Sequence, residues 1–487
     1  MMMIIMMVLL LMFGGVLGSA QSGGATLNCN GLDEVDCTLL RETADTMRTV
    51  TSFEMPAWAV DARLVSADEG ITLRANGTGT AVLPATLTGI FQDVPGVMSI
   101  TDLSPIIDVL NQLDADVIEA TLTETGLHLV LESGELSIPD TADLAGEAQL
   151  LVKDAGLFLQ LPSPNGAVAW FGEDLALDAN ARSELDTMLS EALSALESDD
   201  AKALVAQLSE VSGTLGELQE LLNDSVITER LDDDTLQGEA MAVFVSEFDL
   251  LRLLSDPDLG TLLYRMLENP VVADLMSDMD LGLGDMELDD LSEQDVRFLL
   301  VSLGLLIEDS NFTLTQWVGL DDGYVHGFIY DFNLALDLSI LGDESMQSVE
   351  IALMFDVMLD EFNMASLDGI KTPELAGSLD DIENFAPGGP DLIEGQLELG
   401  TVHTDSITSD GDGQDFFALE LKAGDTVTLA AETDGYVYVT VYGPDGFEID
   451  STNSYDEALT ITAKQSGVYL VEAQGYGDFD YDLRVDG

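Results

Sequence analysis

The residues that most often do chemistry in enzymes are scarce in this chain. It contains only three histidines, His128, His326 and His403, and none has a candidate nucleophile close in sequence. The His-Glu-x-x-His pattern of zinc peptidases and the Gly-x-Ser-x-Gly pattern of serine hydrolases are both missing from the sequence. We therefore predict no catalytic residues, no cofactor and no enzymatic activity. The histidines are expected to be isolated strand or surface residues.

One loop in the C-terminal part has the oxygen donors that calcium prefers. Asp410, Asp412 and Asp415 alternate with glycine and glutamine, and calcium loops place carboxylates at alternate positions. The twelfth position, where an EF-hand has a carboxylate, holds Leu421. The three aspartates are therefore weak calcium candidates, and otherwise no metal ligands are predicted. The alternative is a plain Asp- and Gly-rich turn that leads into a strand.

The N-terminal segment and the two cysteines predict an exported protein. Residues 1–20 are largely apolar and end in small residues that suit cleavage of a signal peptide after Ala20. A retained N-terminal anchor is the alternative. Cys29 and Cys37 are the only cysteines, and in an oxidising compartment we expect them to form a disulfide that staples the start of a helix at 39–50. The expected location is extracellular or periplasmic.

The balance of charge excludes several partners. The chain has 92 acidic against 15 basic residues, a formal net charge of -77, yet 46% of its residues are apolar. That apolar content is enough for large cores, so the charge is expected on the surface of folded domains. Nucleic acids and anionic membrane surfaces are repelled by such a surface. Adaptation to a saline medium and a general acidic bias of the source lineage are equally open explanations.

Residues 51–375 alternate between strand-like and helix-like stretches. Extended or period-two segments are expected at 52–65, 121–138 (as hairpins around Gly126 and Gly134), 150–161, 237–250, 311–341 (with a turn at 321–323) and 348–362. Amphipathic helices are expected at 181–222, broken near 198–200, and at 249–280, interrupted at Pro257 and Pro270. Strand blocks separated from helix blocks predict an α+β fold in which one curved antiparallel sheet packs on helices.

Several short phrases in this region are similar to the LolA/LppX-like lipoprotein-carrier superfamily. They are 156–161 followed by Trp170, 236–249, the Trp317-to-Gly323 hairpin, and 355–363 followed by Pro373. The resemblance implies that 51–375 form an incomplete β-barrel closed by helices, with a concave apolar face that holds a lipid or other hydrophobic ligand. Trp170 and Trp317 are then expected to be structural anchors of the sheet.

The last part of the chain has a different texture. Residues 376–395 combine proline, glycine and acids without periodicity and are expected to be a linker. Residues 396–487 contain short alternating strands with frequent turns, typical of an antiparallel β-sandwich. This segment resembles the bacterial pre-peptidase C-terminal domain, and the matching residues are Asp415-Phe-Phe, Ala423-Gly424, Tyr442 to Gly446, Gly467-Val-Tyr469, and Tyr481, Leu483 and Val485.

The sequence therefore predicts a signal peptide (1–20), a disulfide-stapled helix (21–50), a carrier-like α+β domain (51–375), a linker (376–395) and a β-sandwich (396–487). The expected function is non-enzymatic binding of a hydrophobic small molecule or lipid outside the cytoplasm. A cell-surface or secreted interaction protein without a ligand cavity, with cell-envelope components as partners, is the alternative. A secreted peptidase-associated protein is a third reading.

Overall fold

The computed structural model describes residues 29–487 except 67–68, 86–103, 138–143, 197, 199–212, 215, 270–291, 337–348, 387, 390–391, 408–412 and 476. The expected signal peptide lies outside the described residues. The chain divides into two compact units. Unit 1 comprises residues 1–54, 82–125 and 176–365, and unit 2 comprises 55–81, 126–175 and 366–487. The structure is built mostly from strands, and all α-helices in its described part lie in unit 1.

The first helix of unit 1 begins earlier than the sequence predicts. Helix α2 spans Glu34–Met47, because the Asp33 carboxylate accepts hydrogen bonds from the Val35 and Asp36 N–H groups, at 2.9 and 3.0 Å, and caps the first turn. The expected disulfide between Cys29 and Cys37 is confirmed. It closes onto the first turns of α2, and so it staples the helix start as predicted.

Further helices of unit 1 are α4 (Ser104–Gln112), α5 (Ala115–Glu124), α6 (Ala179–Leu196), α8 (Leu250–Ser255), α9 (Pro257–Leu267) and α11 (Glu293–Leu306). The predicted interruption at Pro257 is confirmed, because this proline occupies the first turn of α9 behind the Asp256 cap. Ser292 and Asp295 form a capping box at the start of α11. None of the helices described is both long and apolar enough to pass through a membrane.

The strands of unit 1 are β7 (Val226–Arg230), β8 (Asp234–Leu236), β9 (Glu239–Phe248), β10 (Ile307–Gly319), β11 (Val325–Leu336) and β12 (Val349–Asp360). Strands β10 and β11 form the expected hairpin around 321–323. The pairs β7–β9, β9–β10, β10–β11 and β11–β12 are all antiparallel. Strands β9 to β12 lie largely within the stretches where period-two alternation predicts strands.

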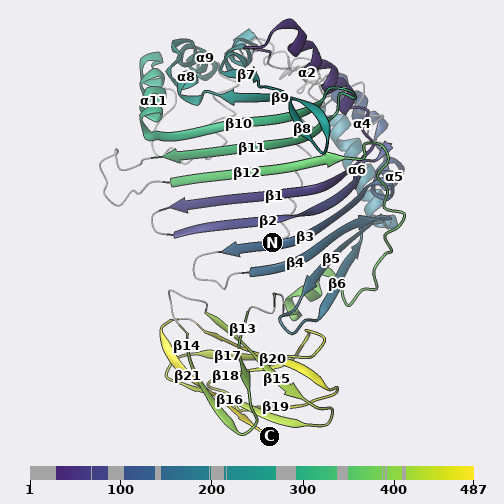
Figure 1. The fold of residues 1–487 in the computed structure, drawn as a ribbon, viewed down its shortest axis with the longest axis vertical. Coiled ribbons are helices and arrows are strands. Elements are labelled where there is room, and N and C mark those ends of the chain that lie inside the picture. The colour runs from purple at the N-terminus through teal and green to yellow at the C-terminus, as the bar shows by residue number, and fades with distance from the viewer. Residues whose placement is uncertain are drawn as a thin grey trace. The chain divides into compact units, whose positions relative to one another are not determined.

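The first six strands of the chain belong to unit 2, apart from the start of β1 and the last residue of β2. They are β1 (Ser52–Ser66), β2 (Glu69–Val82), β3 (Gly126–Ser137), β4 (Leu144–Lys153), β5 (Gly156–Pro162) and β6 (Val168–Asp174). Gly77 permits close pairing of β2 and β3, because a Cβ at this position would lie 1.8 Å from the Val130 carbonyl oxygen. In the large sheet, the strands of unit 2 have the order β6-β5-β4-β3-β2-β1, and those of unit 1 have the order β12-β11-β10-β9-β7, with β8 paired to β9 (Figure 1).

The expected hairpins at 121–138 are wrong. Residues 115–124 form helix α5, and a single strand, β3, follows from Gly126. The alternating threonines of this stretch lie partly in the helix, where Thr121 and Thr123 donate their hydroxyl hydrogens to the Val117 and Glu119 carbonyl oxygens, at 2.8 and 2.9 Å. Back-bonding of this kind satisfies threonine inside a helix, so the period-two pattern was a poor guide here.

Two further sheets occupy the C-terminal part of unit 2. Their strands are β13 (Ile393–Leu397), β14 (Thr401–Ile407), β15 (Gln414–Leu421), β16 (Thr426–Thr433), β17 (Val437–Tyr442), β18 (Glu448–Asn453), β19 (Leu459–Thr462), β20 (Gly467–Gly475) and β21 (Phe479–Asp486). The orders are β13-β15-β20-β17-β18 and β14-β21-β16-β19. Inward residues of both sheets, such as Phe417 and Leu483, share one core. The expectation of purely antiparallel pairing is wrong at one edge, where β13 runs parallel to β15.

The segment expected to be a linker carries two core residues. It contains the short 3-10 helix η3 (Leu379–Asn384), followed by Phe385 and Ala386, which are 2% and 0% exposed. Phe385 packs with Leu159, Leu161 and Phe171 of β5 and β6. Ala386 packs with Phe416, Tyr442 and Leu470 of the C-terminal sheets. A solvated linker would leave both side chains in water, so this part of the segment is structured; the domain boundaries themselves stay predictions.

Candidate functional site

One face of strands β10, β11 and β12 is apolar. Cross-strand neighbours point to the same side of a sheet, and the register places Phe312 opposite Phe332, Leu314 opposite Tyr330, Tyr330 opposite Phe355, Phe332 opposite Leu353 and Leu334 opposite Ile351. We call these residues, together with Phe328, the apolar face. The three strands therefore present a continuous hydrophobic surface within unit 1.

Helices cover one end of the apolar face. Leu253 and Leu254 of α8 and Leu259 of α9 form a core with Ile307, against which Phe248, Leu334 and Leu336 pack. The rings of Phe248 and Phe312 meet edge to face with centroids 5.8 Å apart, and those of Phe312 and Phe332 at 4.7 Å. This row of aromatic rings runs across strands β9, β10 and β11, next to the helix-covered end.

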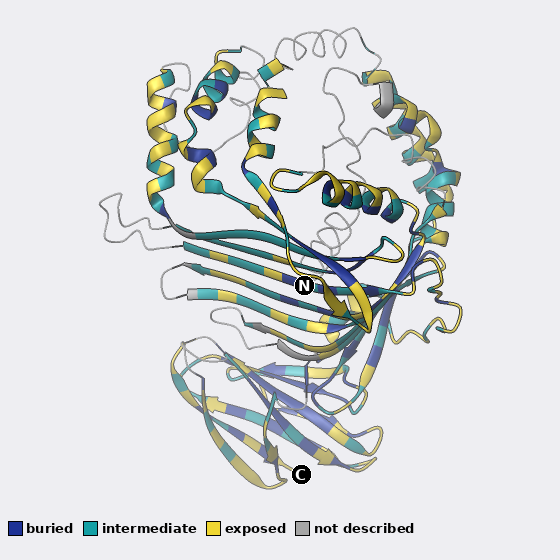
Figure 2. Cartoon of the chain, turned by 45° about the horizontal axis from the view of Figure 1, so that its top comes forward, coloured by how far each residue is buried: buried dark blue, intermediate teal, exposed yellow. Residues whose placement is uncertain are grey.

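The rest of the apolar face remains partly open. Tyr330 and Ile351 are 36% and 37% exposed, whereas Phe355 is buried; the phenylalanines at 312, 328 and 332 are half-buried (Figure 2). Partial burial is enough to raise the pKa of the Tyr330 hydroxyl. Contiguous apolar surface that folding leaves accessible marks a place where another molecule can bind.

The opposite face of the same strands is the more polar of the two, although Ile329, Met354 and Met358 also lie on it. Asn311 donates a hydrogen bond to the Asp331 carboxylate at 3.0 Å, and Asp331 is paired with Met354 on β12. Burial raises the pKa of the Asp356 carboxyl on this face. Strand β12 therefore offers a matched pair of positions for substitution. Ile351 and Met354 are similarly exposed, at 37% and 40%, but lie on opposite sides of the sheet.

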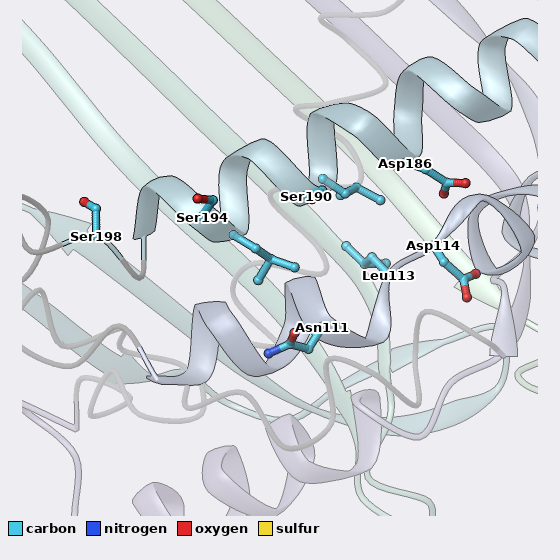
Figure 3. Close-up of a pocket in the computed structure, with 9 residues that line it drawn as sticks. Asn111, Leu113, Asp114, Asp186, Ser190, Ser194 and Ser198 are labelled. Carbon is cyan, nitrogen blue, oxygen red and sulfur yellow. The ribbon is translucent and has the colours of Figure 1, made fainter.

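Besides the apolar face, unit 1 has a hollow between helices α4 and α6. It has a volume of about 830 Å³ and is lined by Asn111, Leu113, Asp114, Asp186, Leu189, Ser190, Leu193, Ser194 and Ser198 (Figure 3). Asp186 accepts a hydrogen bond from the Ala115 N–H at 3.3 Å, which fixes α6 against α5. Because hydroxyl and carboxylate groups form so much of this lining, it is less suited than the apolar face to a hydrophobic ligand.

The structure places one calcium candidate, Asp415, in a cluster of carboxylates. Ligand oxygens of Glu394, Asp405 and Asp415 lie within 4.8 Å of one another. Asp415 is 3% exposed and accepts a hydrogen bond of 2.5 Å from the Tyr481 hydroxyl. The other candidates, Asp410 and Asp412, lie outside the described residues. Oxygen-only donors suit a hard cation such as calcium, and calcium binding stays a prediction.

The sequence analysis missed Glu394 and Asp405. They reach Asp415 through pairing of distant strands, because β13 pairs with β15, and β14 with β21. Asp405 also lies 3.2 Å from the His403 ring nitrogen. The sequence carries no local signal for this meeting, since the three carboxylates come from three different strands.

The remaining residues singled out from the sequence lie outside this carboxylate cluster. They are His128, His326, Trp170 and Trp317. His128 of β3 contacts the Gln149 side chain at 3.2 Å, and His326 of β11 contacts Asp322 at 2.9 Å. Trp317 donates its indole N–H to Asp234 at 3.3 Å, and the Trp170 carbonyl oxygen accepts the Ala376 N–H at 2.8 Å. Trp170 and Trp317 are each half-buried. Their assignment as structural anchors stays a prediction.

A buried glutamate in the C-terminal sheets makes stability depend on pH. Glu472 is 6% exposed and accepts hydrogen bonds from the Tyr442 hydroxyl, at 2.5 Å, and from the Gln414 amide. Burial raises the pKa of its carboxyl above the ordinary value, although these two hydrogen bonds oppose the shift. A folded-state pKa above the unfolded one contributes stability at low pH, and this contribution is lost as the pH rises through the folded pKa.

We therefore expect Glu472→Gln to raise the free energy of unfolding at neutral pH and to have little effect near pH 4, where the Glu472 carboxyl is largely protonated in both the folded and the unfolded chain. Scanning calorimetry of the full chain over this pH range measures the difference. Glu420→Gln, at an exposed position on neighbouring β15, controls for the removal of one negative charge. A gain that does not change with pH, or an equal gain in the control, would contradict the prediction.

Comparison with known proteins gives few matches. No family model matches the chain, and no curated protein does. Among solved structures, the pre-peptidase C-terminal domain of a collagenase from Bacillus anthracis is 18% identical, covering 19% of this chain and 96% of that one with a TM-score of 0.17. A periplasmic inhibitor of g-type lysozyme from Salmonella Typhimurium is 16% identical, covering 19% and 97% with a TM-score of 0.15.

A larger part of the chain is matched by a DUF1329 family protein from Desulfovibrio piger. It is 6% identical and covers 65% of this chain and 88% of that one, with a TM-score of 0.12. These values are too low to assign the chain to a shared fold or function. The chemistry of the site therefore has to be read from this chain's own residues.

Proposed function

We propose that this chain is an exported, non-enzymatic binding protein that holds a hydrophobic or lipid-like ligand against the apolar face. The observation that carries the proposal is the half-exposed row of aromatic and aliphatic side chains on β10–β12, continuous with the core under α8 and α9. Burying such a row under an acyl chain removes apolar surface from water on both partners, which is the main driving force for binding of this kind.

Export is part of the same proposal. An apolar leader with a small-residue cleavage site and a disulfide between Cys29 and Cys37 both suit an oxidising compartment outside the cytoplasm. In this proposal the large sheet curves into a half-barrel around the ligand, and the C-terminal sheets form a β-sandwich of the pre-peptidase type with an accessory role.

The charge of the chain narrows the ligand class. A net charge of -77 repels anionic amphiphiles over the distance that salt leaves unscreened. We therefore propose a neutral or zwitterionic ligand. An anionic probe with the same acyl chain should bind more weakly at low salt, and the difference should shrink as salt is added.

Titration of the full chain with a fluorescent zwitterionic lysophospholipid tests the proposal. We expect saturable binding that Ile351→Asn weakens about tenfold or more, because a polar amide replaces an aliphatic group on the apolar face. Met354→Asn is the matched control: its position is equally exposed on the same strand but faces the polar side. Failure of the probe to bind saturably, or equal losses in the two variants, would refute the proposal.

A further inference from the structure

Two turns at one end of the unit 1 strands bring an imidazole and two carboxylates together. Ligand atoms of Glu239, Asp322 and His326 lie within 4.8 Å of one another. Glu239 is the first residue of β9, Asp322 lies in the β10–β11 turn, and His326 is the second residue of β11 (Figure 1). Asp322 and His326 are four residues apart at the same hairpin, whereas Glu239 comes from a distant part of the sequence on the neighbouring strand β9.

The pairing of β9 with β10 explains why these turns meet. Met241 lies opposite Gly319, and the Leu320 N–H donates a hydrogen bond to the Ala240 carbonyl oxygen at 3.1 Å. This register places the start of β9 next to the end of β10. Glu239 therefore lies beside the turn that contains Asp322.

The backbone of the turn orients the Asp322 carboxylate. Its Oδ1 atom accepts a hydrogen bond from the Tyr324 N–H at 3.1 Å, and its Oδ2 atom lies 2.9 Å from the His326 Nε2 atom. Gly319 makes room for this arrangement, because a Cβ at that position would lie 2.1 Å from Asp322 Oδ1. One carboxylate oxygen is thus held by the main chain while the other faces the imidazole.

The burial of the three residues differs in a way that suits an ion-binding site. His326 is 7% exposed, and the Phe362 ring meets its imidazole edge to face at 5.3 Å. Glu239 and Asp322 are exposed. The imidazole is therefore fixed from behind by packing, while the carboxylates are open to solvent, from which an ion can enter.

We propose that Glu239, Asp322 and His326 bind a divalent transition-metal ion of the zinc type. One imidazole nitrogen with two carboxylate oxygens is a donor set that such ions accept, whereas calcium and magnesium prefer oxygen alone. Three protein ligands leave a fourth position of the tetrahedron for water. With bonds of about 2.1 Å, a tetrahedral ion holds its ligand atoms about 3.4 Å apart. Asp322 Oδ2 and His326 Nε2, which now lie 2.9 Å apart, would separate slightly to bind it, and the exposed Glu239 side chain can reach the ion by a change of rotamer. The bound ion would tie the β9 turn to the β10–β11 turn.

Zinc and cobalt titrations of the full chain test this site. We expect one Zn²⁺ to bind saturably by calorimetry in about 0.5 M salt, where nonspecific attraction to the acidic surface is screened. Glu239→Gln should weaken Zn²⁺ binding about tenfold or more, because it removes one of the three ligands, and even the loss of a residue that only supports a ligand commonly costs tenfold. Asp321→Asn, an exposed acid in the same turn, should leave the affinity unchanged.

The small number of histidines gives a second, independent readout. The chain has three imidazoles, so a histidine-selective nitrogen NMR spectrum can follow each of them while Co²⁺ is added. We expect the His326 signals to broaden or shift first, and His403→Gln to leave both the Co²⁺ response and Zn²⁺ affinity unchanged. His326→Gln should abolish the Co²⁺ absorption bands.

Three results would overturn the proposal. The first is Zn²⁺ binding that Asp321→Asn weakens as much as Glu239→Gln. The second is a Co²⁺ response at His403 or His128 in place of His326, and the third is the absence of saturable binding in salt. Because Glu239 is exposed, its glutamine variant is expected to fold, which circular dichroism can verify, so the test does not depend on the buried histidine.

Discussion

Replacing Phe171 with alanine is expected to lower the free energy of unfolding of unit 2 by about 3–5 kcal/mol. Phe171 of β6 is 0% exposed. Its ring meets those of Phe385 and Phe447 with centroid distances of 5.3 and 5.9 Å, and Phe385 meets Phe447 at 5.3 Å. The three rings come from a strand of the large sheet, the segment after η3 and the turn before β18. Removing the central ring would leave a cavity that none of these segments can fill without moving.

Scanning calorimetry of the full chain should show the loss as a lower melting temperature. Val168→Ala provides the control, because Val168 lies on the same strand but is 58% exposed. The control should change the melting temperature little. A Phe171 variant that melts like the control would mean that the aromatic cluster adds little to stability.

Tyr481→Phe is expected to lower the free energy of unfolding by about 2 kcal/mol, the usual effect of removing a hydrogen bond to a charged group. The Tyr481 hydroxyl donates to Asp415 at 2.5 Å, and both residues are buried. Burial and the neighbouring Asp415 carboxylate raise the pKa of the Tyr481 hydroxyl, so it remains a donor throughout the accessible pH range. Without the Tyr481 hydroxyl, the buried Asp415 carboxylate loses a hydrogen bond that water cannot replace.

Tyr438→Phe is the matched control for this variant. The Tyr438 hydroxyl also makes a hydrogen bond, at 2.8 Å to Ser451, but its residue is 39% exposed, so water can replace the partner. Melting temperatures measured by calorimetry should fall for Tyr481→Phe and hardly change for Tyr438→Phe. Equal effects would contradict the prediction. Repeating the scans in a chelator and in millimolar calcium also tests the calcium expectation: an unchanged melting temperature would rule it out.

The parts of the fold that depend on neighbouring residues could be predicted from the sequence. The β10–β11 hairpin is one case, since the Asp322-Gly323 pair and the alternation on both sides are local signals. The break before α9 is another, because Pro257 cannot continue a helix. Helix α2 begins before the predicted residue 39 because Asp33 caps its first turn.

The candidate sites could be predicted only in part. The apolar character of the strands is visible in the sequence, but which side chains share a face across three strands depends on the register. Glu239 and His326 meet only because β9 pairs with β10, and Glu394 reaches Asp415 only because β13 pairs with β15. Sequence periodicity assigns a residue to one side of its own strand. It does not say which distant strand lies next to it.

The adjacent positions of Phe385 and Ala386 in two different cores limit how this chain can be divided. A fragment that begins at residue 396 would leave Phe416, Tyr442 and Leu470 without the Ala386 side of their core. A fragment that ends before Phe385 would uncover Phe171 and Leu159 instead. The C-terminal sheets are therefore poor candidates for a portable module: transplanted onto another protein, they would need residues 376–395 and would carry an exposed phenylalanine with them. Any exchange of this region between proteins must therefore replace Phe385 and Ala386 together with the core residues that each of them contacts.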